Sequence, residues 1–431
     1  MKRIIFAMMI FAGMILPAIV VSQPVRYSDA HAAEGFSIAE SSTGLVRVSF
    51  SIHRLGLDEQ VANGRVYTNL SLPGSFLFNA AGSPNLPGNG RLIANPDGAV
   101  ARLKIISSRT EVIHDIDILP APVIPKETDP GPPQIQADAS VYSRDAFYPA
   151  EPVTISAPFI LRGVSVVTLG ITPFQYNPVT RELHVLRDIE AEISFGGGSG
   201  TYGEERLRSR FWDPILEDAL LNYASVPPVD YDHRMTANAD PTGWEYLIIT
   251  PTGADFQAWA DTIRRFRIRQ GISTVVKTLA EVGGNTTSAI ETYINNAYAT
   301  WNPAPAAVLL LGDYGTDASN SVISPIYNSY CVSDNIYGDV DGNHLPDISM
   351  ARITANNAAQ LQVMVSKFLN YEKNPPSSAY FYQHPITALG WQTERWFQIC
   401  SEVTGGFWKN VQLKDPIRIN EVYSGTPASA W

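Results

Sequence analysis

Residues 244–250 read WEYLIIT, and this stretch decides the fold of the second half of the chain. A short, continuous apolar run is typical of a strand that is buried on both faces of a sheet. The segment after it has the period of a helix: Trp259, Ile263 and Phe266 share one face, its arginines lie largely on the other, and Gly271 ends it. We therefore predict a buried strand followed by a helix that covers it.

The same alternation continues toward the C-terminus. Further strands are predicted at 273–279, 307–313, 347–353, 386–391 and 417–423. Further helices are predicted at 286–301, 356–372 and 394–409. Strands that alternate with helices form a parallel sheet covered by helices, and ligands collect at the carboxyl ends of its strands. The second half is therefore predicted to be an α/β domain.

The first half has a different period. Between about residues 36 and 195, apolar and polar residues alternate within runs that are separated by Gly, Pro and Asn. These runs are 44–52, 65–72, 101–108, 164–171 and 181–195. Period two with frequent turn residues predicts an all-β region, arranged as a β-sandwich.

A change of composition separates the two halves. Residues 196–200 read GGGSG, and the next forty residues show no steady period. We interpret 196–240 as an exposed linker that a protease can cut. Its candidate cleavage sites are Arg206, Arg208, Arg210 and Arg234.

Length and charge narrow the function. A chain of 431 residues has room for two or three domains, and 45% hydrophobic with 17% charged residues describes a folded protein. The net charge is -11 and no basic stripe is present, which argues against a nucleic-acid partner.

The N-terminus predicts export. Lys2 and Arg3 precede an apolar run over 4–21, and Ala30-His31-Ala32 offers a small-residue cleavage site, so 1–33 reads as a signal peptide. The alternative is an uncleaved anchor, because the run has about the minimum length that spans a bilayer. We expect a secreted or cell-envelope protein with no stable membrane insertion after signal removal.

The two cysteines do not suggest a catalytic pair within this chain. Cys331 and Cys400 are too few for a disulfide scaffold, so one bridge and two buried free thiols both stay open. A catalytic thiol needs a base, and His344 and His384 are available. However, Cys400 lies in an amphipathic helix where burial is expected, and no glycine-flanked His lies near Cys331. The GxSxG, HExxH and P-loop motifs are absent from the sequence, which removes the α/β-hydrolase, metalloprotease and P-loop classes.

The run GDVDGNHLPDI at 338–348 is a candidate calcium loop. Asp341, Asn343 and Asp347, with carbonyls such as that of Leu345, offer the oxygen ligands that Ca²⁺ prefers. The spacing is not that of an EF-hand, since Met350 stands where a bidentate Glu would be needed. The alternative is an Asx-rich turn whose carboxylates only cap the backbone.

Two further acidic residues are candidates for the site. Asp313 ends a predicted strand, and we expect it to meet the oxygens of the 338–348 loop. Glu394 lies just past another strand, where it either orients a catalytic base or occupies the first turn of its helix, favoured there by the helix dipole.

Several ordered segments resemble one peptidase family. Residues 244–315 resemble the start of the catalytic domain of gingipain-type cysteine peptidases, and 333–353, SDNIYGDVDGNHLPDISMARI, resembles the segment that follows in that family. Residues 141–195 resemble the end of the family's propeptide. The resemblance implies an exported zymogen, in which a β-rich propeptide folds against a caspase-like α/β domain and blocks it until the linker is cut.

The resemblance also implies residue roles. It implies a structural calcium ion held by Asp313, Asp341, Asn343, Asp347 and the carbonyl of Leu345. Glu394 falls near the carboxylate that orients the catalytic His in the family. The catalytic Cys and the Gly-His-Gly motif of the family are not in this sequence, so the resemblance implies that the dyad follows Trp431 and that this chain alone is inactive.

These expectations combine into one interpretation. We expect a signal peptide (1–33), a β-rich propeptide (34–195), a linker (196–240) and the first part of a peptidase domain (241–431), that is, a multidomain α+β protein truncated at its C-terminus. The expected function is that of a cysteine endopeptidase zymogen that cleaves proteins or peptides and has its own propeptide as inhibitor. One alternative is a non-catalytic, calcium-stabilised binding or adhesion protein, and another is a propeptide-like inhibitor that acts alone.

Overall fold

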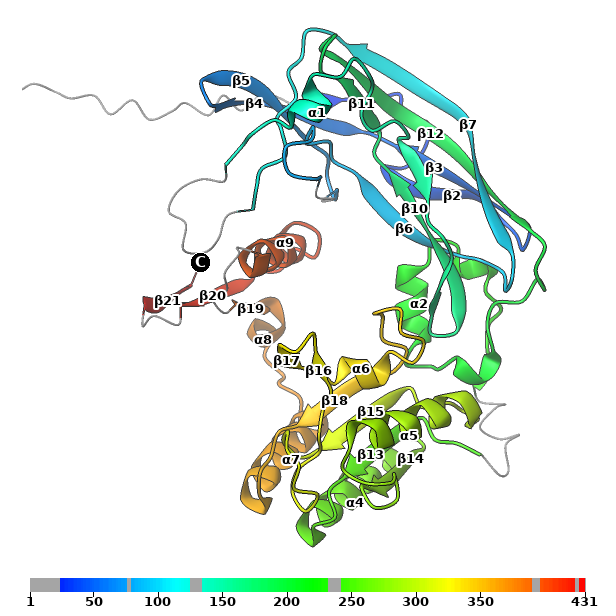
Figure 1. The fold of residues 1–431 in the computed structure, drawn as a ribbon, viewed down its shortest axis with the longest axis vertical. Helices are drawn as coiled ribbons and strands as arrows, with labels where there is room; N and C mark the ends of the chain where they lie inside the picture. The colour runs from blue at the N-terminus through cyan, green and yellow to red at the C-terminus, as the bar shows by residue number, and fades with distance from the viewer. Residues whose placement is uncertain are drawn as a thin grey trace, which may run out of the picture.

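The computed structural model describes residues 24–75, 79–124, 134–231, 242–389, 396–422 and 426–430. A β-rich part, up to residue 231, precedes an α/β part that begins at residue 242 (Figure 1). The predicted fold class, a β-sandwich followed by an α/β domain with a parallel sheet, is confirmed. Within the described ranges, no helix is long and apolar enough to cross a membrane.

Two antiparallel sheets form the sandwich of the β-rich part. The first has the order β11-β12-β3-β2, with β7 also paired to β12, and the second has the order β6-β10-β8, with β9 also paired to β10. The strands of the first sheet are β2 (Gly35–Ser41), β3 (Leu45–Ser51), β7 (Val100–Ile113), β11 (Phe174–Asn177) and β12 (Glu182–Gly196). The strands of the second are β6 (Asn89–Ala94), β8 (Val153–Ile155), β9 (Phe159–Leu161) and β10 (Val164–Ile171).

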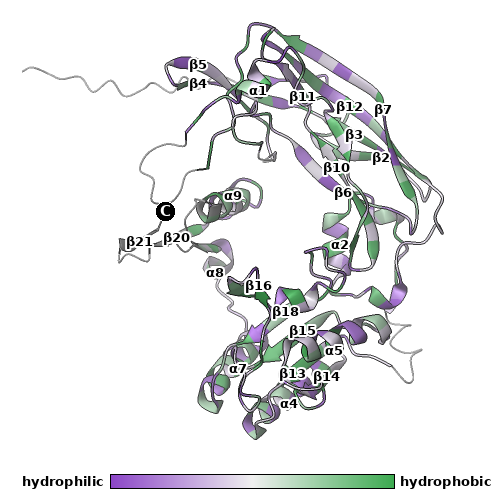
Figure 2. Cartoon of the chain, in the orientation of Figure 1, coloured by the Kyte–Doolittle hydropathy of each residue, from purple (hydrophilic) through white to green (hydrophobic). Residues whose placement is uncertain are grey.

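Alternating side chains pack the two sheets face to face. Val46 and Val48 of β3 and Val167 and Leu169 of β10 are at most 1% exposed and belong to one core cluster. Figure 2 shows the alternation of hydrophilic and hydrophobic residues along the long strands. This is the arrangement that period two predicts for a sandwich.

A third, smaller sheet holds the start of the described chain. It consists of β1 (Val25–Arg26), β4 (Arg54–Ala62) and β5 (Arg65–Ser71), in the order β1-β4-β5. Tyr27 is 8% exposed, and Asp29 pairs with Arg109 at 2.9 Å. Residues 24–33 are thus part of the folded sandwich. Part of the stretch predicted as a signal peptide is therefore folded in this structure, and residues 1–23 lie outside the described ranges.

The segment predicted as an exposed linker is largely folded. It contains η1 (Glu205–Leu207), α2 (Asp213–Ala219) and η2 (Tyr223–Ser225). Leu216 and Leu220 pack against Val164 and Val166 on the outer face of β10, whereas Leu207 joins the core of the α/β part. Residues 202–226 therefore connect two hydrophobic cores, and the interpretation of this stretch as an exposed linker is wrong. It shows no steady period because its side chains face two different cores.

A four-stranded parallel sheet is the centre of the α/β part. It has the order β14-β13-β15-β18, and all three pairs are parallel. The strands are β13 (Tyr246–Thr250), β14 (Thr274–Thr278), β15 (Ala307–Leu311) and β18 (Ser349–Ile353). The helices that cover it are α4 (Ala254–Arg269), α5 (Thr287–Thr300) and α7 (Ala358–Lys373).

The two faces of this sheet bury different helices. Leu247 and Leu310 share a cluster with Ile290 of α5, whereas Ile248 shares a cluster with Ile263 of α4 and with residues of α7. Successive strand residues point to opposite faces, so an uninterrupted apolar run supplies both cores. The strand predicted from WEYLIIT is therefore buried on both sides, as expected.

Capping residues explain where two of these helices begin. The side chain of Thr286 accepts a hydrogen bond from the N–H of Ala289, and that of Asn357 accepts one from Gln360. Short oxygen-bearing side chains at this position satisfy N–H groups that have no partner within the helix.

The remaining elements form smaller units. They are α1 (Ala139–Tyr142), β16 (Ile326–Tyr327), β17 (Cys331–Val332), α6 (Asn335–Gly338), α8 (Ala379–Gln383), β19 (Ile386–Leu389), α9 (Trp396–Asn410), β20 (Ile417–Val422) and β21 (Thr426–Ala430). β19 pairs with β20 in parallel, and β21 pairs with β20 in antiparallel. The sequence predicted β19 and β20 as strands of the same parallel series, but they form a separate sheet. Periodicity identifies a strand without identifying its neighbour.

Candidate functional site: an acidic loop at the amino edge of the parallel sheet

The candidate calcium loop connects α6 to β18 and is closed by its own backbone. The N–H groups of Asp347 and Ile348 both donate to the carbonyl of Gly338, at 2.7 and 3.1 Å. Gly342 and His344 have left-handed backbones, with φ of 76° and 69°. A tight turn of this kind curls short acidic side chains toward a common centre.

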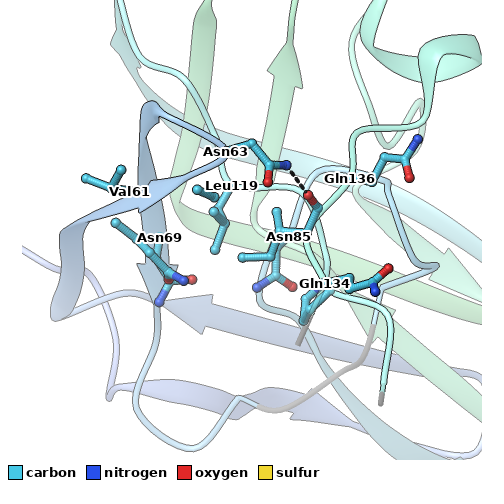
Figure 3. Close-up of a pocket in the computed structure, with 11 residues that line it drawn as sticks. Val61, Asn63, Asn69, Asn85, Leu119, Gln134 and Gln136 are labelled. Carbon is cyan, nitrogen blue, oxygen red and sulfur yellow. Dashed lines mark hydrogen bonds between the residues drawn. The ribbon is translucent and has the colours of Figure 1, made fainter. Parts of the chain in front are cut away.

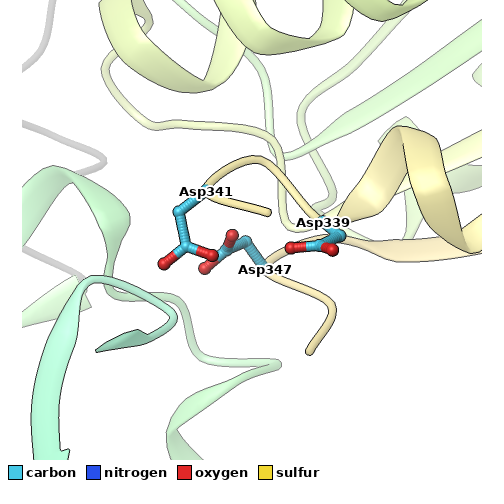
Figure 4. A group of neighbouring side chains, drawn as sticks. All are labelled: Asp339, Asp341 and Asp347. Atoms are coloured by element: carbon cyan, nitrogen blue, oxygen red, sulfur yellow. The ribbon is translucent and has the colours of Figure 1, made fainter. Parts of the chain in front are cut away.

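Three carboxylates meet inside this loop. One oxygen from each of Asp339, Asp341 and Asp347 lies within 4.8 Å of the other two (Figure 4). Asp347 is 2% exposed, whereas Asp341 is open to solvent. Asp339 was not among the predicted ligands. Its position two residues before Asp341 could have identified it, because alternating short acidic residues are typical of calcium loops.

The carboxylates repel one another at short range. Burial raises the pKa of Asp347, and the negative charge of Asp341 raises it further. The N–H of Val340 donates to Asp347 Oδ2 at 3.1 Å and offsets part of this cost. The site therefore holds more negative charge than its own hydrogen bonds neutralise.

Asn343 connects the loop internally and to the sandwich. Its Oδ1 accepts from the N–H of Leu345 at 2.8 Å, and its Nδ2 donates to Asp341 Oδ2 at 3.0 Å and to the carbonyl of Ile160 at 2.7 Å. The N–H of Asn343 also donates to Asp339 and Asp341, as an Asx-rich turn would. Each carboxylate has about four lone-pair sites, so these bonds leave oxygen electron pairs for a cation. An all-oxygen set with three carboxylates fits the preference of Ca²⁺.

Asp313 lies at the opposite edge of the sheet. It follows the carboxyl end of β15, whereas the acidic loop precedes the amino end of β18, and β15 and β18 are parallel with Ala307 opposite Ser349. At about 3.3 Å per residue, the length of a five-residue strand separates them. The carboxylate of Asp313 instead accepts from Asn356 at 3.0 Å. The expectation that Asp313 meets this loop is wrong, because a loop that enters a parallel strand and one that leaves its neighbour lie at opposite edges.

The described residues do not assemble a catalytic pair. Cys331 and Cys400 are both free and exposed, so the burial expected for Cys400 is not found. His384 stacks on Tyr380, and within the described ranges neither cysteine has a hydrogen bond to a histidine. Glu394 lies outside the described residues.

One further cavity lies in the β-rich part, away from the acidic loop. It has a volume of about 660 Å³ between the β4–β5 hairpin and residues 134–136 (Figure 3). Its polar lining is made of amides, among them Asn63, Asn69 and Gln136. None of the described residues that line it titrates, so this part of the chain brings no acid or base to the cavity.

Comparison with protein families identifies both parts of the chain. Residues 35–225 match the model Propeptide_C25, and residues 239–418 match the model Peptidase family C25. The two matches are consecutive and in the order of a propeptide and its peptidase. The chain belongs to the gingipain-type cysteine peptidases. It carries a propeptide and part of the catalytic domain.

Curated relatives agree with this assignment. The chain is 28% identical to Lys-gingipain of Porphyromonas gingivalis over 336 residues, which is 75% of this chain and 19% of the relative. It is 25% identical to gingipain R2 of the same species over 307 residues, 68% of this chain and 38% of the relative. The chain thus spans between about a fifth and two fifths of the length of these relatives.

Two solved structures are also similar to this gingipain-type chain. One is the complex of the RgpB pro- and mature domains of Porphyromonas gingivalis, with 24% identity, a TM-score of 0.39 and coverage of 44% of this chain and 97% of that one. The other, titled for the zymogenic latency of gingipain K of the same species, has 26% identity, a TM-score of 0.34 and coverage of 41% of this chain and 99% of that one.

Three of the four predicted cleavage arginines of this gingipain-type chain are held in the fold. Arg208 is 3% exposed and makes two hydrogen bonds to the carboxylate of Asp213, at 2.7 and 2.9 Å. Arg206 donates to the carbonyl of Tyr298, and Arg210 donates to that of Gly271. A protease needs an extended, accessible segment, which this stretch is not. Arg234, the fourth candidate, lies outside the described residues.

We predict that a trypsin-like protease leaves the bonds after Arg206, Arg208 and Arg210 intact in the native chain. Cutting needs local opening of the fold. The rate of cleavage at each of these bonds is therefore expected to be at least about 100-fold lower in the native chain than in the unfolded chain. Mass spectrometry of a timed digest measures this. The same digest in urea is the control, in which all three bonds are cut, and an early native cut after Arg208 would contradict the structure.

Proposed function

We propose that this chain is the propeptide and the first part of the catalytic domain of a gingipain-type cysteine endopeptidase zymogen, which acts on proteins or peptides. The observation that carries the proposal is the order of the two family matches, because they coincide with a folded β-sandwich and a folded parallel α/β sheet. The β-rich part would act as the inhibitor until it is released from the peptidase domain.

The proposed chemistry needs a thiolate and a histidine. The thiolate attacks the scissile carbonyl, the histidine passes its proton to the leaving amine, and water then releases the acyl-enzyme. We propose that both groups come from sequence that follows this chain in the complete protein. The exposed, unpaired state of Cys331 and Cys400 supports this. Glu394 is proposed as the carboxylate that orients the histidine.

We further propose a structural calcium ion in the acidic loop. Asp339, Asp341 and Asp347 would hold it, with Oδ1 of Asn343 and the carbonyl of Leu345. The bound ion would neutralise the mutual repulsion of the carboxylates and fix the loop that leads into β18. The distances among the three carboxylates support this set, and Asp313 is not part of it.

We also propose that the protein is exported to the cell envelope or beyond. The charged start and the apolar run over 4–21 support a leader, and the folded position of Tyr27 supports removal before Val25.

The function is tested on the complete protein that contains this chain. After cleavage between its two parts and removal of the β-rich part, it is expected to hydrolyse peptides, and iodoacetamide is expected to abolish this activity while a serine-directed fluorophosphonate leaves it unchanged. Peptide hydrolysis that survives iodoacetamide, or no hydrolysis after the β-rich part has been cut off and removed, would contradict the proposal.

A further inference from the structure

The tip of the β9–β10 hairpin places an arginine inside the molecule. Arg162 is 0% exposed, and it has φ of +50°, with +77° at Gly163. Two left-handed residues form a turn that usually takes Asn, Asp or Gly, so an arginine here is strained. A Cβ on Gly163 would lie 2.4 Å from Leu207, so the tip also fits closely. Strain and burial of a charge persist only where contacts compensate for them.

Three carbonyls and two aromatic rings surround the guanidinium of Arg162. Its Nε donates to the carbonyl of Leu207 at 2.7 Å, and its Nη1 donates to those of Pro305 and Asp347 at 2.9 and 2.7 Å. The rings of Trp212 and Tyr298 lie 5.5 and 5.2 Å from it. We call these five residues, Leu207, Trp212, Tyr298, Pro305 and Asp347, the arginine socket.

The socket binds a cation without a carboxylate hydrogen bond. Burial lowers the pKa of Arg162 to about 10, which still leaves it charged at neutral pH. Carbonyl oxygens and the faces of aromatic rings both attract a guanidinium, and they do so in directions that a lysine ammonium cannot match.

Two further arginines bind carbonyls near the socket. The socket lies at the amino edge of the parallel sheet, where chains leave helices and enter strands. Helix C-termini carry unpaired carbonyls and the negative end of the helix dipole. Arg206 donates to Tyr298 in the last turn of α5, and Arg210 donates to Gly271 just after α4. Arginines of the β-rich part thus cap this edge at several points.

We propose that the arginine socket holds the propeptide on the peptidase domain after the chain between them has been cut. The half of the socket in the α/β part, Tyr298, Pro305 and Asp347, recognises an arginine that is presented on a tight turn. While Arg162 stays in place, residues 204–213 stay folded against the sheet edge. The inference rests on the proposed zymogen only in assuming such a cut, and its test measures association, not hydrolysis.

The test separates the two parts by a defined cut. A recognition sequence for a site-specific protease is inserted between residues 234 and 240, and the chain is cut there. Size-exclusion chromatography then shows whether the two pieces coelute, and a titration of one piece with the other gives the dissociation constant. The wild-type pieces are expected to coelute at micromolar concentration. Arg162→Gln is expected to weaken association by about 100-fold or more, and Arg162→Lys is expected to fall between the two.

Matched controls distinguish loss of the socket from loss of folding. Arg54→Gln, which removes an exposed ion pair with Glu34 on the same part, is expected to change the dissociation constant by less than about twofold. Circular dichroism of the uncut Arg162→Gln chain reports folding, and since the two parts have separate cores it is expected to match wild type.

If Arg162→Gln does not fold, Tyr298→Leu tests the socket from the α/β side and is expected to weaken association by about tenfold or more. Wild-type pieces that separate at micromolar concentration, or folded socket variants that associate as tightly as wild type, would overturn the proposal.

Discussion

Replacing Arg352 with leucine is expected to lower the free energy of unfolding of the α/β part by about 3–5 kcal/mol. The guanidinium of Arg352 donates to both carboxylate oxygens of Asp334, each at 2.8 Å. It also donates to the carbonyls of Gly312 and Val322, at 2.9 and 2.7 Å. The two charged side chains are 9% and 22% exposed, so water cannot replace these bonds when the arginine is removed.

The Arg352–Asp334 pair also makes the free energy of unfolding depend on pH. Burial alone would raise the pKa of Asp334, but hydrogen bonds and charge from Arg352 outweigh it and hold the pKa below its usual value. The folded protein therefore binds the proton more weakly than the unfolded chain does. The contribution of the pair is fully present above about pH 4, the unfolded pKa, and is lost as the pH falls through the lower folded value. The difference in the free energy of unfolding between wild type and Arg352→Leu should therefore become smaller as the pH falls.

Urea unfolding at pH 7 and pH 3 measures both effects. Arg265→Leu is the matched control: Arg265 pairs with Asp261 on the surface of α4, and its side chain is 70% exposed. That variant is expected to stay within about 0.5 kcal/mol of wild type. If the free energy of unfolding of Arg352→Leu at pH 7 lies within about 1 kcal/mol of the wild-type value, the pair does not stabilise the sheet.

Calcium is expected to stabilise the α/β part by about 3–4 kcal/mol when its concentration is 100 to 1,000 times the dissociation constant. The physical reason is the excess of negative charge among Asp339, Asp341 and Asp347, which repel one another without a cation. Asp347→Asn is expected to remove most of this gain. In EDTA the same substitution is expected to be neutral or stabilising, because it relieves the repulsion from Asp341 and a buried charge.

Thermal unfolding in calcium and in EDTA separates these outcomes. Asp313→Asn is the control, because Asp313 lies at the other edge of the sheet, bonded to Asn356. That variant should respond to calcium as wild type does. Equal calcium responses of wild type and Asp347→Asn, or no response in wild type, would exclude the proposed site.

The acidic loop lies in contact with the tip of the β9–β10 hairpin of the propeptide. Asn343 bonds to the carbonyl of Ile160, and Arg162 bonds to the carbonyl of Asp347. Whatever orders this loop therefore also orders part of the surface on which the hairpin tip rests.

The sequence pattern predicted the strands well because the apolar residues of each strand reveal which of its faces are buried. WEYLIIT is largely apolar because both faces of β13 are covered. The alternation in β3 follows from a strand that buries one face in the core of the sandwich. The acidic loop was recognisable because Asp339, Asp341 and Asp347 are close in sequence.

Long-range placement was not predictable from the same signals. Arg162 bonds to residues 45, 143 and 185 positions away, and no local spacing encodes such contacts. Asp313 does follow the carboxyl end of its strand, as predicted, but the loop that was expected to reach it enters β18 at the amino edge of the sheet. Residues 202–226 lacked a period although they are folded, because they pack on two separate cores.

The most direct test of the zymogen proposal is the rate of peptide hydrolysis by the complete protein, measured before the cut between its parts, after the β-rich part has been removed, and after that part has been added back. We expect the rate to rise steeply on removal and to fall again on addition. A rate that does not change on removal, or that decreases, would contradict the assignment of the β-rich part as the inhibitor of this peptidase.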